Sequence, residues 1–162
     1  MSEEKPKEIE DEQEKSSQDG IERDHGKIDY TLQVFSHLAN AYSIGFPVTL
    51  SVGGLVISGI IVSRDEYMKS VANSLREGVS KLQDEIKEFL ESQVFKPMTR
   101  PLDKKGQGYV VENTKYIHLK NARVFNTSGQ PVPARGSGFL WRGRISSVDG
   151  FSIGKLEYRG IE

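Results

Sequence analysis

Apolar residues recur every three or four positions over residues 30–41, a spacing typical of one face of an α-helix. Asp29, directly before them, is a residue type that caps helix N-termini. Gly45 and Pro47 follow and favour termination. The pattern therefore predicts a short amphipathic helix from Tyr30 to about Ala41, with an apolar face formed by Leu32, Phe35, Leu38, Ala39 and Tyr42.

Strict alternation of apolar and polar residues follows over 48–52, which is typical of a half-buried strand. Gly53 and Gly54 then supply two residues that adopt positive φ without strain, and a β-branched run extends from Leu55 to Val62. We expect a β-hairpin here. Gly59, inside its second strand, predicts a bulge or a sharp bend.

The longest apolar stripe follows, and it predicts a single helix of about 27 residues, roughly 40 Å long. Ser63 and Glu66 have the spacing of a capping box at its start. Glu77, Lys81 and Glu85 would form weak pairs on its polar face, and Gly78 would mark a close packing contact. The stripe comprises Tyr67, Met68, Val71, Leu75, Val79, Leu82, Ile86, Phe89 and Leu90.

Such a helix would either pack on its own sheet or overhang it and pack between copies of the protein. Under the second reading the candidate self-association residues are Val71, Leu75, Val79, Leu82, Ile86 and Phe89.

Residues 96–114 contain two prolines, two glycines and four bases among them and predict a connecting loop. Strands are expected over 115–126, with a bulge near Asn121, over 138–145 and over 151–156. In the middle one, alternation places Trp141 on one face and Arg142 and Arg144 on the other. The whole predicts an α+β fold: a small five-stranded antiparallel, strongly bent sheet or barrel of the Sm/SH3-like kind, with an N-terminal helix and the long amphipathic helix inserted between strands two and three.

The overall balance of 22 basic and 23 acidic residues conceals an asymmetry. Residues 1–29 hold eleven acids and five bases, a net charge of −6, which leaves +5 for the remainder. Too few apolar residues precede Lys27 to offset the entropy of ordering. We therefore expect a disordered acidic tail over 1–28 and a single domain over 29–162, the tail being either a solvating extension or an arm that folds back on the positive domain.

Catalytic and metal chemistry find little support in the sequence. Cysteine is absent, and His25, His37 and His118 share no metal-ligand spacing. We expect His118 to be a surface or boundary residue, and we expect no enzyme activity, no cofactor and no metal. The longest apolar run is under half the length of a membrane span, and the acidic N-terminus does not resemble a secretory signal, so a cytoplasmic protein is expected.

The C-terminal region carries the more informative chemistry. Basic and aromatic residues are interleaved there, a mixture that can bind nucleic acid through phosphates and bases. The competing interpretation is a solvated sheet face with the tryptophan in the core, and the acidic tail is a further candidate partner. The candidate interaction residues are Tyr116, Lys120, Arg123, Trp141, Arg142 and Arg144, with Arg135 nearby.

Four segments, 48–63, 116–125, 139–145 and 148–155, resemble the GvpU family of gas vesicle accessory proteins. The sequence WRGRI at 141–145, followed by VDGF at 148–151 and by Gly154-Lys155, is the most specific part of this likeness. The resemblance implies a non-catalytic cytoplasmic protein that is associated with gas vesicles, self-associates and clusters them. It does not extend to the acidic N-terminus or to the linker 96–114.

A weaker likeness is to Sm-like small barrels, from which the long inserted helix departs. Three hypotheses follow: a self-associating scaffold that tethers vesicles, an Sm-like RNA-binding module, and an assembly chaperone that masks the apolar shell protein. Homo-oligomers and gas vesicle proteins are the expected partners, with neither membrane nor nucleic acid favoured.

Overall fold

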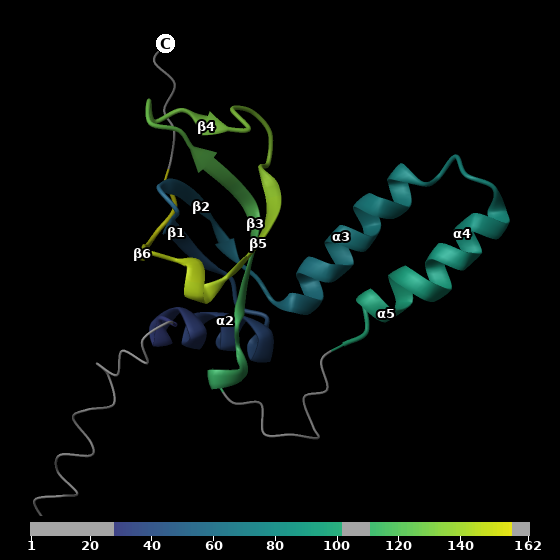
Figure 1. Cartoon of the computed structure of the whole chain (residues 1–162), viewed down its shortest axis with the longest axis horizontal. Helices are drawn as coiled ribbons and strands as arrows, with labels where there is room; N and C mark the ends of the chain where they lie inside the picture. Colours follow the sequence, from purple (N-terminus) through teal and green to yellow (C-terminus); the bar gives the residue numbers. More distant parts are fainter. Residues whose placement is uncertain (1–27, 102–110, 157–162) are drawn as a thin grey trace, which may run out of the picture.

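A computed structural model describes residues 28–101 and 111–156 as an α+β fold with a six-stranded antiparallel sheet (Figure 1). The expected tail and the middle of the expected 96–114 loop lie outside the described residues. The strands are β1 (Phe46–Val52), β2 (Leu55–Ile61), β3 (Tyr116–Phe125), β4 (Pro131–Val132), β5 (Phe139–Arg144) and β6 (Gly150–Ile153).

Helix α2 (Tyr30–Tyr42) confirms the first prediction. The Asp29 carboxylate accepts a hydrogen bond from the backbone N–H of Leu32 at 2.9 Å, as an N-cap does. Leu32 and Ala39 are fully buried against the sheet. Tyr42, expected on the same apolar face, is 69% exposed because it forms the last residue of the helix, beyond the sheet contact.

Strands β1 and β2 form the predicted hairpin. Gly53 and Gly54 join them with φ values of 56° and 80°, the positive values that a tight two-residue turn requires. The hairpin buries Val48, Leu50 and Ile57 in a core that also contains Ile117, Leu119 and Ile145.

The predicted irregularity near Asn121 is confirmed as a bulge in β3. Ile60 pairs with Lys120 but Ser58 pairs with Arg123, so β3 carries one residue more than β2 at this point. Asn121 has a φ of 52°. A Cβ atom at Gly59 would lie 3.2 Å from the Ala122 Cα and from the Lys120 carbonyl oxygen. Gly59 therefore lets β2 approach the bulge closely.

The sheet is antiparallel, as expected, but it has six strands instead of five and it is open, so the barrel alternative of the prediction is not found in the described residues. The strands run in the order β4-β3-β2-β1-β6, and β5 pairs with β3 beside β4. The additional strand, β4, is two residues long and pairs with the end of β3. Within the described residues β5 and β6 do not pair with each other, so an edge of each remains free.

The single long helix is the prediction that the structure corrects most clearly. Helix α3 (Arg64–Gly78) ends at Gly78, and the chain turns back into α4 (Asp84–Leu90), a π-helical turn (Glu91–Phe95) and α5 (Lys96–Met98). Together these segments form a helical hairpin that projects from the sheet (Figure 1). The two short 3-10 turns are Val111–Asn113 and Ile145–Ser147.

Gly78, Val79 and Ser80 favour the break, because all three are poorer helix formers than alanine. Folding back also stabilises this arrangement, because it buries the Phe95 side chain, which is only 3% exposed. A Cβ at Gly78 would meet nothing within 4 Å, so the expected close packing there is wrong. Lys81 now lies in the turn between the helices, outside any helix on which the expected pairs could form.

The capping box at the start of α3 is half formed. The Ser63 hydroxyl accepts from the Glu66 backbone N–H at 3.1 Å. The Glu66 carboxylate, however, binds the Lys120 ammonium on β3 at 2.7 Å. Glu66 therefore links the helical hairpin to the sheet.

Candidate functional site

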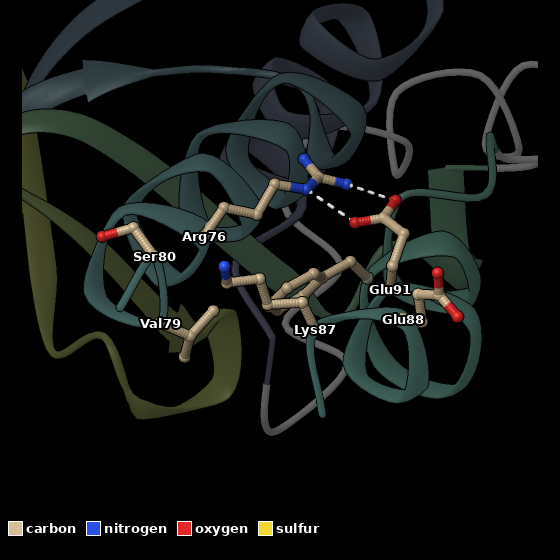
Figure 2. A pocket seen from close by; sticks show the side chains of 7 residues that line it. Arg76, Val79, Ser80, Lys87, Glu88 and Glu91 are labelled. Carbon is tan, nitrogen blue, oxygen red and sulfur yellow. Dashed lines mark hydrogen bonds and ion pairs between the residues drawn. The ribbon is translucent and has the colours of Figure 1, made fainter. Parts of the chain in front are cut away.

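The two arms of the helical hairpin are joined by a bidentate ion pair (Figure 2). The Arg76 Nε and Nη2 each donate to the Glu91 carboxylate at 2.9 Å. The Arg76 guanidinium carbon also lies 5.1 Å from the centre of the Phe95 ring. The hydrogen bond from Arg76 lowers the pKa of Glu91, and the same bond raises the pKa of Arg76.

Next to this pair an open hollow of about 320 Å³ lies between the arms of the helical hairpin. Its walls are mainly apolar, because the long side chains present their aliphatic stems to it. The charged ends of Arg76, Lys87, Glu88 and Glu91 surround it (Figure 2). The remaining lining residues are Val79, Ser80 and Phe95.

Four of the six residues predicted for self-association have exposed side chains on the hairpin. Leu75 and Ile86 are each 44% exposed, Leu82 is 41% exposed and Phe89 is 62% exposed. Val94, which the sequence pattern did not single out, is 38% exposed. Val71 and Val79 are half-buried, because the chain folds back over this side of α3. The hairpin thus carries several large apolar groups that nothing in the described chain covers.

A second candidate surface lies on the outer face of β3 and β5, and we call it the basic face. Tyr116 pairs with Arg144 and His118 pairs with Arg142, so all four side chains project from the same side of the sheet. The Arg142 guanidinium carbon lies 3.8 Å from the centre of the Tyr116 ring, which is a cation–π contact. Arg142 and Arg144 are both exposed.

The other predicted interaction residues divide between this face and the core. Lys120 and Arg123 lie further along the same side of β3, Lys120 paired with Glu66 and Arg123 donating to the Gly136 carbonyl oxygen. Trp141 pairs with Leu119 and packs against the core on the opposite side. The structure therefore brings five of the six residues to one face and separates Trp141 from them.

His118 projects from the same side of the sheet as the basic face but is covered by α3, where the sequence predicted a surface or boundary residue. It is only 5% exposed, and the Tyr67 ring of α3 lies 4.9 Å from it. Burial, reinforced by the charges of Arg142 and Arg64, lowers the pKa of His118 to about 4. Its buried Nε2 has no hydrogen-bond partner among the described residues. No local sequence pattern signals this burial, because the covering side chain, Tyr67, lies on the helical hairpin.

The WRGR sequence has a packing explanation. A Cβ at Gly143 would lie 2.6 Å from Cζ2 and 2.9 Å from Cζ3 of Trp141. The indole therefore lies across the glycine backbone, which only a residue without a side chain permits. This arrangement holds Trp141 against the core while Arg142 and Arg144 project outward.

Within residues 28–101 and 111–156, no group of three histidine or acidic side chains could hold a metal ion. In the same part of the chain no helix combines the length and apolarity needed to cross a bilayer.

Comparison with known families identifies a family model that matches this chain. The model described as gas vesicle protein GvpU-like matches residues 29–156, which includes every described helix and strand. Comparisons with curated proteins and with solved structures give no match.

Proposed function

Because this chain belongs to the GvpU-like family of gas vesicle proteins, we propose that it is a non-catalytic accessory protein that self-associates and tethers gas vesicles into clusters. It acts in the cytoplasm at the vesicle surface. Its direct partners are further copies of itself and one or more proteins of the vesicle.

The observation that carries this proposal is the apolar surface of the helical hairpin. Leu82, Ile86 and Phe89 are each more than two-fifths exposed on an element that projects from the sheet. Burying apolar surface contributes roughly 25 cal/mol of favourable free energy for each Å² removed from water. Contact with a second helical hairpin or with an apolar vesicle surface would therefore be favourable at these residues. Exposed apolar surface on a projecting element is typical of interaction sites, and this supports the proposal.

Tethering also requires at least two contacts per assembly. The open sheet offers the second one, because the outer edges of β5 and β6 are unpaired in the described chain. Free strand edges readily pair with another chain. A copy that uses its hairpin for one contact and a sheet edge for another can link into larger assemblies.

Sedimentation velocity over a concentration series tests self-association. We expect the wild-type chain to form oligomers, and the double variant Leu82→Glu/Phe89→Glu to shift strongly toward monomer, because each carboxylate would lose its water on docking. Leu55→Glu is the matched control. Leu55 is 50% exposed, but it lies on β2 of the sheet, away from the helical hairpin. A strict monomer at working concentration, with or without vesicles, would refute the proposal.

The apolar-walled hollow supports a second candidate function, an assembly chaperone for the shell protein. Such a chaperone would hold an apolar segment of the unassembled shell subunit in the hairpin. Co-expression followed by pulldown separates the two functions. A soluble complex with unassembled shell protein supports the chaperone, whereas binding only to intact vesicles supports the tether.

A further inference from the structure

The basic face has a surplus of positive charge that the rest of the domain does not neutralise. Residues 111–156 contain seven basic and two acidic residues. Lys120 is paired with Glu66. Among the side chains that the structure describes, no carboxylate lies within ion-pairing distance of Arg142 or Arg144. These two exposed arginines are therefore available to an anionic partner.

Their spacing defines what partner would fit. Arg142 and Arg144 are alternate residues of one strand, so their backbone positions are about 6.6–6.8 Å apart. The Tyr116 ring against Arg142 restricts that guanidinium to one side of the strand. An extended peptide with a carboxylate at every second residue matches this repeat, because it has the same spacing.

The chain contains such a peptide in its own N-terminal sequence. Residues 8–14 read EIEDEQE, with glutamates at 8, 10, 12 and 14. In an extended conformation these four carboxylates would project from one side of the backbone, one for each second residue. The N-terminal segment 1–27 as a whole contains ten acids and five bases.

The geometry of the domain also allows the contact. The Gln33 side chain, one helical turn after Asp29, donates to the Thr114 carbonyl oxygen at 3.0 Å. Thr114 comes two residues before Tyr116, the partner of Arg144. The first turn of α2 thus lies near the end of the basic face. Thirteen residues separate Glu14 from Ile28 and span up to about 45 Å when extended, so the linkage can reach β5.

We propose that the acidic segment 8–14 binds the basic face in an extended conformation, with alternate glutamates on Arg142 and Arg144 along the free edge of β5. The segment comes from the same copy or from a neighbouring one. In the first case it covers the face and the edge of β5 and leaves the edge of β6 for the contact between copies; in the second it links copies. Either contact weakens with salt, because the pairs are solvent-accessible.

Paramagnetic relaxation enhancement tests the contact in the full-length chain. The sequence has no cysteine, so Ser17→Cys provides a unique site for a nitroxide label three residues after Glu14. At low salt we expect enhanced relaxation of the β5 amides and of the Tyr116 end of β3. Mixing labelled unenriched protein with ¹⁵N-enriched unlabelled protein then distinguishes binding between copies from binding within one.

Two charge variants, each with a matched control, identify the charged side chains that form the contact. Replacing Glu8, Glu10, Glu12 and Glu14 with glutamine abolishes the enhancement, whereas the control set Glu3→Gln, Glu4→Gln, Asp19→Asn and Glu22→Gln retains it despite the same change in charge. Likewise Arg142→Gln/Arg144→Gln abolishes the enhancement, and the control Lys69→Gln/Lys81→Gln, on the exposed surface of the hairpin, retains it.

Equal loss in both glutamate sets, or enhancement spread evenly over the domain, would overturn the proposal. So would a basic face whose amides respond only to added single-stranded RNA and never to the label. Neither result affects the tethering proposal, which rests on the helical hairpin.

Discussion

Replacing Gly143 with alanine tests the packing explanation of the WRGR sequence. The new Cβ would lie 2.6 Å from Cζ2 of Trp141, whereas carbon atoms in favourable contact are about 3.5–4.0 Å apart. The backbone of β5 is held by its pairing with β3, so the indole has to move. We expect Trp141 to leave its contact with the core.

The loss of stability follows from the apolar area of the indole that becomes exposed to water. A tryptophan side chain buries on the order of 150–250 Å² in a core, and Trp141 is half-buried, so roughly 100 Å² would return to water. At about 25 cal/mol for each Å², the free energy of unfolding should fall by about 2–3 kcal/mol.

Urea unfolding followed by far-UV circular dichroism measures this change. Trp141 is the only tryptophan, so its emission reports independently and should shift to longer wavelength. Gly150→Ala is the control, because a Cβ there meets nothing within 4 Å, and its unfolding free energy should stay within about 0.5 kcal/mol of wild type. Wild-type stability and unchanged emission in Gly143→Ala would refute the reasoning.

Three further predictions concern the bulge, the buried histidine and the hairpin ion pair. Gly59→Ala brings a Cβ to 3.2 Å from the backbone of β3 and should lower the free energy of unfolding, measured with urea, by about 1–3 kcal/mol. An unchanged free energy would show that the backbone at the bulge can move to make room for the methyl group. The pKa of His118, lowered to about 4, means that the unfolded chain takes up this proton first as the pH falls below 6.5. Folding stability from this group is therefore present above pH 6.5 and lost toward pH 4, and His118→Gln should remove about 2 kcal/mol of the fall in stability between pH 8 and pH 5; an unchanged pH dependence would contradict the burial. Because the pKa of Glu91 is lowered, the stability from its ion pair with Arg76 is fully present above the usual glutamate pKa and is lost as the pH falls through the lowered pKa. Glu91→Gln should speed amide exchange over 84–98 at pH 7, and exchange equal to wild type would show that the ion pair does not hold the hairpin.

Features specified by neighbouring residues were predictable from the sequence. The Asp29 cap, the Gly53-Gly54 turn and the bulge near Asn121 each depend on a few consecutive residues with particular backbone preferences. The same holds for the alternation in β5, which correctly separated Trp141 from Arg142 and Arg144.

Features set by distant contacts were not predictable in this way. The apolar stripe over 67–90 has an uninterrupted helical period, yet the chain breaks after Gly78 because folding back buries Phe95 and pairs Arg76 with Glu91. The burial of His118 likewise comes from Tyr67, 51 positions earlier in the chain. Periodicity identifies the apolar residues that are expected to be buried, but it does not identify the element that covers them.

The central claim, that the helical hairpin tethers gas vesicles, is tested most directly by light scattering of purified vesicles mixed with the full-length protein. We expect wild type and Leu55→Glu to increase the apparent particle size by clustering vesicles. Leu82→Glu/Phe89→Glu, with an unchanged circular dichroism spectrum, should leave the vesicles dispersed. Equal clustering by the double variant would contradict the account.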